Sequence, residues 1–99
     1  MRRTATDTHR LIFPFQVSEA DKMRITYSQD GEIILEKTLE DVDIDGRKAI
    51  VHLTTEETAL FDVGLAEVQA KIGIRGEVVA TKEHKFSIRK ILNPADLDA

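Results

Sequence analysis

Apolar and polar residues alternate along most of this chain in short runs, and single glycines separate the runs. Alternation with a period of two places apolar side chains on one face of a β-strand and polar side chains on the other. Six or seven short strands with closely spaced turn signals indicate an all-β fold, a compact antiparallel β-sandwich of the immunoglobulin-like type. The runs predict strands at 11–15, 23–28, 32–36, 49–53, 66–74 and 78–91, the last with a bend at 82–85.

The registers of two hairpins can be argued from which residues face each other. A two-residue turn in the first hairpin places Ile25 opposite Glu36, which puts the two apolar sets on different faces of the sheet. A three-residue loop with a glycine bulge pairs Ile25 with Leu35 instead, and the same reasoning at the second hairpin pairs Ile72 with Val78. The glycines expected at the turns are Gly31 in the first hairpin, Gly76 in the second, and Gly46 between them.

One segment departs from the strand period and predicts a short helix. Thr54 and Glu57 have the spacing of a capping box, in which each side chain bonds the backbone N–H of the other residue. Acidic residues in a first helical turn also interact favourably with the helix dipole. We therefore expect one or two helical turns within 54–61, and a strand after them.

The chain divides into three regions by composition. Residues 1–9 are polar with little apolar content, which predicts a flexible N-terminal arm. Residues 10–92 carry the β-sandwich pattern, and 93–99 form a C-terminal tail. Pro14 cannot donate to a strand ladder, so 11–15 is expected to be an edge strand.

Composition limits the classes of function. The 99 residues include no cysteine, which excludes disulfides, thiolate nucleophiles and cysteine-based zinc sites. A net charge of −4 with both signs mixed argues against a nucleic-acid groove. No apolar run approaches the roughly 20 residues that cross a bilayer, so no membrane partner is expected.

An acidic segment is the sharpest chemical motif. Asp41, Asp43 and Asp45 precede Gly46 with the spacing of the first half of a calcium-binding loop. The carboxylate that such a loop needs at its twelfth position is replaced by His52. The segment is therefore a candidate calcium site with an incomplete ligand set, and the alternative interpretation is an acidic β-turn.

No set of residues in the sequence predicts catalysis. The three histidines, His9, His52 and His84, fall in the arm, a strand and a bend, and they are interpreted as surface or rim residues. No nucleophile motif or phosphate-binding glycine loop occurs, so we expect no catalytic residue and no cofactor. The aromatic residues are expected in the core: Phe13, Phe15, Tyr27, Phe61 and Phe86.

Several segments carry a family resemblance. The apolar, threonine and glutamate positions of 31–38, 51–61, 66–71 and 86–92 resemble those of small virion proteins of phages and prophages of Gram-positive bacteria. They are also similar to the N-terminal β-domain of upper baseplate proteins from such phages. The resemblance implies a compact sandwich that assembles with other structural proteins, and it carries over no catalytic residue.

Two functions follow as hypotheses. The first is a non-enzymatic phage structural protein of the head–tail joint, tail or baseplate, made in the host bacterial cytoplasm and located in the virion. Its partners would be other phage structural proteins or further copies of itself, in a homo-oligomer, with edge strands such as 11–15 docking by strand addition. The alternative is a small sandwich module that binds calcium or a cell-wall carbohydrate through the loop at 40–47.

Overall fold

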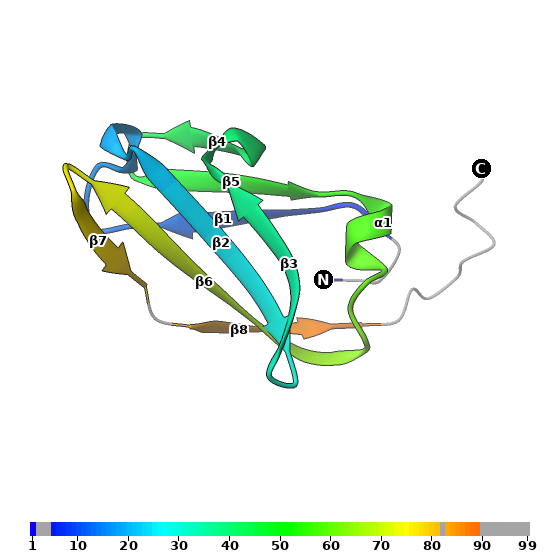
Figure 1. Ribbon diagram of the computed structural model, residues 1–99. Helices are drawn as coiled ribbons and strands as arrows, with labels where there is room; N and C mark the ends of the chain where they lie inside the picture. Colours follow the sequence, from blue (N-terminus) through cyan, green and yellow to red (C-terminus); the bar gives the residue numbers. More distant parts are fainter. Residues whose placement is uncertain (2–4, 82, 90–99) are drawn as a thin grey trace.

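The computed structural model describes residues 1, 5–81 and 83–89. In this part of the chain, two antiparallel sheets pack face to face (Figure 1), which confirms the predicted all-β sandwich. The elements in chain order are β1 Asp7–Ile12, η1 Val17–Glu19, β2 Lys22–Gln29, β3 Glu32–Thr38, η2 Leu39–Asp41, β4 Val42–Asp45, β5 Lys48–Leu53, α1 Thr55–Thr58, β6 Gly64–Ile74, β7 Glu77–Ala80 and β8 His84–Ile88.

The two sheets differ in size. The smaller has the order β1-β5-β4, and the larger has the order β3-β2-β6 with β7 and β8 both paired to β6. β7 pairs with 71–74 of β6, and β8 with 64–68. The single bent strand predicted at 78–91 is therefore two strands, because the backbone N–H and C=O of Ala70 bond the side chain and backbone of Thr81 in the gap between them.

The hydrophobic core lies between the sheets. Strands that face it show the expected alternation, with every second residue buried along β2, β5 and β6. Of the five aromatic side chains, three are buried and two pack against the core, as predicted. The buried apolar residues are Phe13, Val17, Met23, Ile25, Tyr27, Ala49, Val51, Leu53, Phe61, Ala66, Val68, Ala70, Ile72 and Ile88.

The first hairpin differs from the predicted register. Its turn has two residues, Asp30 and Gly31, both with positive φ, and no three-residue loop forms. Leu35 lies opposite Tyr27 and not opposite Ile25 as predicted, and Ile25 pairs with Lys37, because Ile34 is an extra residue that bulges out of β3. The predicted three-residue loop is wrong. A bulge within β3 adds one residue, which turns the side chain of Leu35 to the core face although the turn has only two residues.

The second hairpin shows the same kind of error. Arg75 and Gly76 form a two-residue turn with φ values of 52° and 83°, and Ile72 pairs with Val79 where we expected Val78. Two-residue turns with positive φ match the right-handed twist of the strands they join. All three glycines expected at turns do have positive φ, including Gly46 in the β4–β5 link.

The N-terminal residues also differ from the prediction. Residues 7–9 are the first half of β1, which pairs with β5 from Asp7↔Leu53 to Ile12↔Lys48, so the predicted flexible arm is wrong for these positions. β1 is an edge strand, as expected for this part of the chain, but it ends at Ile12 and does not include 13–15. The predicted C-terminal tail at 93–99 lies outside the described residues.

Candidate functional site

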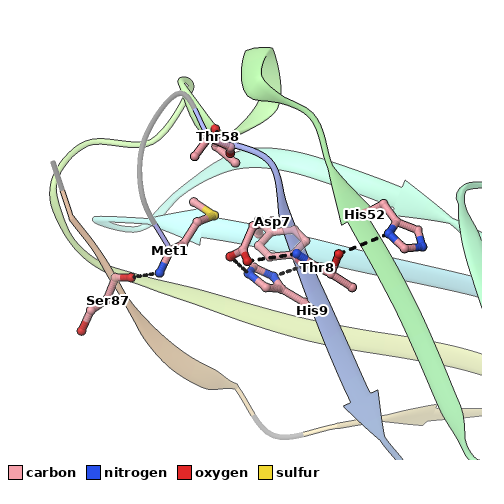
Figure 2. A network of polar contacts seen from close by, with 9 residues as sticks. Met1, Asp7, Thr8, His9, His52, Thr58 and Ser87 are labelled. Carbon is pink, nitrogen blue, oxygen red and sulfur yellow. Dashed lines mark hydrogen bonds and ion pairs between the residues drawn. The ribbon is translucent and has the colours of Figure 1, made fainter. Parts of the chain in front are cut away.

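A chain of three polar side chains joins the two sheets near the start of the protein (Figure 2). The His9 Nε2 lies 2.8 Å from Oδ2 of Asp7, and the His9 Nδ1 lies 2.7 Å from the hydroxyl of Tyr27. A carboxylate can only accept, so Nε2–H donates to Asp7, and in the neutral imidazole Nδ1 accepts the Tyr27 hydroxyl proton. This network links β1 of the smaller sheet to β2 of the larger.

Tyr27 is the buried end of this network. Its side chain is fully buried, and burial first, then the charges of Asp7 and Glu57, raise the pKa of its hydroxyl. Its ring makes edge-to-face contacts with Phe61 and Phe86, each with centroids 5.9 Å apart. The hydroxyl therefore stays protonated and out of contact with solvent, which suits a structural hydrogen bond and does not suit a nucleophile.

The sequence interpretation missed this network. The sequence predicts a flexible arm at His9, whereas the His9 ring packs edge-on to Phe86 with centroids 5.1 Å apart. The usable signal was the alternation of Asp7, His9 and Leu11 with Thr8 and Arg10, which continues the strand pattern towards the N-terminus.

Further contacts tie the chain start to distant elements (Figure 2). The Met1 ammonium group donates to the Ser87 carbonyl at 2.8 Å, and the Arg89 N–H donates to the Met1 carbonyl at 2.8 Å. The Thr58 hydroxyl, from α1, donates to the Ala5 carbonyl at 2.8 Å. Backbone groups at residues 1 and 5 thus contact β8 and α1.

A second polar row lies on the outer face of the smaller sheet. The His52 Nδ1 is 3.3 Å from the Thr8 hydroxyl, and its Nε2 is 2.9 Å from Oδ2 of Asp43. The order hydroxyl, imidazole, carboxylate is the order used in nucleophilic catalysis. Here, however, the His52 and Asp43 side chains are 60% and 73% exposed on a sheet face, where water competes for every partner.

The candidate calcium residues do not converge. Asp41 ends η2 and accepts from the backbone N–H and hydroxyl of Thr38, bonds that lower the pKa of its carboxyl. Asp43 bonds His52, and Asp45 of β4 lies opposite Lys48 of β5. Across the described residues, no three acidic or histidine side chains are grouped to hold a metal ion. An extended strand spaces alternate carboxylates by roughly 7 Å, whereas a calcium loop wraps them around the ion.

The predicted helix cap is confirmed. Thr54 caps α1: its side chain accepts from the Glu57 N–H at 3.2 Å, and Glu57 accepts from the Thr54 N–H at 3.0 Å. Glu57 also forms an ion pair with Lys37 of β3. Burial raises the pKa of Glu57, but the hydrogen bonds from Lys37 and Thr54 outweigh it, and the pKa lies below its usual value.

Gln29 is a second residue whose role the sequence did not reveal. The predicted three-residue loop of the first hairpin consists of 29–31 and so includes Gln29, but Gln29 is buried at the end of β2. Its side-chain amide donates to the carbonyls of Asp62 and Leu65 and accepts from the Asp62 N–H. These three bonds hold the α1–β6 connection against the β2–β3 hairpin.

Comparison with known protein families, curated proteins and solved structures gives no match. Among the described residues, no helix is long and apolar enough to span a membrane.

Large apolar side chains are exposed at one end of the larger sheet. Ile33 pairs with Ser28, which in turn pairs with Glu67, so Ile33 and Leu65 lie on the same outer face. The Gln29 bonds place the connection that carries Leu60 and Val63 at the same end of the sheet. We call this group the hairpin-end surface, and its members are exposed as follows: Ile33 65%, Leu60 56%, Val63 49% and Leu65 61%.

Proposed function

We propose that this chain is a non-enzymatic structural protein that acts through protein–protein contacts, as a virion component of a phage or prophage of Gram-positive bacteria. The observation that carries the proposal is the hairpin-end surface. Single exposed apolar residues are ordinary, but four large ones grouped at one end of a small protein mark an interaction site.

The internal contacts of the sandwich support the same proposal. The Asp7–His9–Tyr27 network and the Gln29 bonds join elements of the fold to one another. The Gln29 bonds fix the α1–β6 connection against the β2–β3 hairpin, which lowers the entropic cost of binding a partner there. The sequence resemblance to small virion proteins suggests that the partner is another structural protein of the particle.

The test is particle composition. In the bacterium that encodes this chain, particles released after prophage induction and purified by density should contain it in fixed proportion to the other structural proteins. Changing Ile33→Ser and Leu65→Ser should remove the chain from the particles while its melting temperature stays close to that of the parent. Val78→Ser changes an apolar residue of β7 that is even more exposed than Ile33 and Leu65; it is the control and should leave incorporation unchanged. Absence of the parent chain from the particles would refute the proposal.

A further inference from the structure

The smaller sheet has two edge strands, β1 and β4, with η1 bonded to the Gly46 carbonyl just after β4. The alternation of hydrogen bonds shows which backbone groups of β1 face away from β5. The Phe13 N–H donates to the Arg47 carbonyl at 2.9 Å, one step beyond the pairing of Ile12 with Lys48. Bonded and non-bonded positions alternate in an antiparallel pair, so odd-numbered residues of β1 bond β5. The backbone groups of Thr8, Arg10 and Ile12 therefore point to the open edge. The Thr8 N–H agrees with this alternation, since it donates to the Asp7 carboxylate and not to β5.

The hydrogen bonds between β5 and β4 alternate in the same way. Even-numbered residues of β5 point towards β4, so Lys48 and Ile50 bond Asp45 and Asp43. The backbone groups of Val42 and Ile44 are then left on the open edge of β4. Their side chains face inward and are half-buried, while those of Asp43 and Asp45 face outward and are exposed.

These two open edges can pair in only one direction. On β1 the residues whose backbone groups face the open edge carry outward side chains, whereas on β4 they carry inward ones. In an antiparallel bonded pair, the backbone groups of both residues face the partner strand and both side chains lie on the same face of the sheet. In a parallel pair, a residue whose backbone groups face the partner strand lies beside a residue whose backbone groups face the other way. Parallel pairing therefore fits, and it places Arg10 directly beside Asp43 or Asp45. β1 and β4 already run parallel, since both are antiparallel to β5.

Charge favours pairing β1 of one copy with β4 of another over the two symmetric arrangements, β1 with β1 and β4 with β4. Two β1 edges related by a two-fold axis bring the Arg10 side chains of both copies onto one face, and two β4 edges bring acidic groups together. Pairing β1 with β4 sets a cation beside anions. A groove of about 370 Å³ lies beside the β1 edge, and its lining includes Leu11, Phe13, Val68 and Ala70.

We propose that the partner on the β1 edge is β4 of a second copy of this chain, added in parallel so that the smaller sheets become continuous. The two copies use different surfaces, so the contact is head-to-tail and builds a ring or a filament. This inference deepens the proposed function, on which it rests, by naming one of the protein partners.

The test is charge exchange across the two edges. Arg10→Glu should weaken self-association by about 10-fold, as should the pair Asp43→Lys and Asp45→Lys, because each sets like charges side by side. A chain with all three changes should regain the parent's association. Lys71→Glu, an equal charge change in the middle of the other sheet, is the control. Mass is measured by sedimentation up to about 1 mM, with circular dichroism as the check of folding.

The outcomes separate the two proposals. Loss of association in both edge variants, with recovery in the triple variant, supports the head-to-tail contact. A parent that is monomeric throughout, or a dimer insensitive to these changes, overturns it. Neither result touches the particle composition, which tests the proposed function separately. Since the edge variants lie on different strands, misfolding of one leaves the other to decide.

Discussion

At the scale of single residues, the contact of His9 with Tyr27 has the largest consequence for the fold. A tyrosine hydroxyl buried without a partner costs free energy, and here the imidazole nitrogen accepts its proton at 2.7 Å. The imidazole is in turn oriented by Asp7 on the same strand. Three side chains on two strands thus satisfy one another where the sheets meet.

Removing the Tyr27 hydroxyl should change both stability and its pH dependence. Tyr27→Phe leaves His9 without one partner, and we expect a loss of about 1–2 kcal/mol at neutral pH. Above about pH 10 the unfolded parent releases the tyrosine proton while the folded one, with its raised pKa, retains it. Parental stability should therefore fall by up to about 1.4 kcal/mol per pH unit there, and the variant should lack this component. Urea unfolding on both sides of pH 10 measures it, and equal slopes would contradict the assignment.

At the scale of elements, the two hairpins show how turn and strand share the register. Both turns put a non-glycine residue at positive φ, Asp30 at 54° and Arg75 at 52°, followed by a glycine. Only the first hairpin needs a bulge, because the turn alone would leave Leu35 on the wrong face. The turn type determines the loop length, and the need to bury apolar side chains determines whether a bulge must shift the register.

Alanine at the turn glycines should be destabilising for a backbone reason alone. A Cβ at Gly31 or Gly76 meets nothing within 4 Å, but φ values of 80° and 83° are unfavourable for an L side chain. We expect each substitution to cost about 1 kcal/mol in thermal or urea unfolding. Gly73→Ala, near the end of β6 and with an ordinary φ, is the control and should be neutral or stabilising. Equal effects at all three sites would contradict the backbone explanation.

At the scale of the whole molecule, β1 acts as a connector. It forms one edge of the smaller sheet and reaches the larger through His9 and Tyr27. The contacts of Met1 with Ser87 and Ala5 with Thr58 extend this connection to β8 and α1. The start of the chain is thereby integrated with elements far along the sequence.

Deletion of residues 1–9 distinguishes a connector from an arm. The truncated chain loses half of β1 and the whole of the Asp7–His9 pair. We expect a loss of several kcal/mol, a large part of the roughly 5–15 kcal/mol that stabilises a small domain. Differential scanning calorimetry should show a much lower transition or none. A truncated chain that melts at the parental temperature would show that the segment is dispensable.

The sequence by itself determined the fold class and the local features. The strand β4 and residues 7–10 of β1 were not predicted, and β7 and β8 were expected as one strand. Alternation is visible within a single strand, so β2, β3, β5 and β6, the inward set Val68, Ala70 and Ile72, and the Thr54–Glu57 cap were predictable. Each of these depends on residues within a few positions of one another.

Only the tertiary structure decided the contacts between distant segments. The bulge at Ile34 is chosen by which face the core covers, and the role of His9 depends on a tyrosine 18 positions away. The separation of Asp41, Asp43 and Asp45 likewise follows from β4 pairing with β5, which extends the segment that a calcium loop would curl. Local pattern specifies which face of a strand is apolar, but what lies against that face is set by the packing of the whole chain.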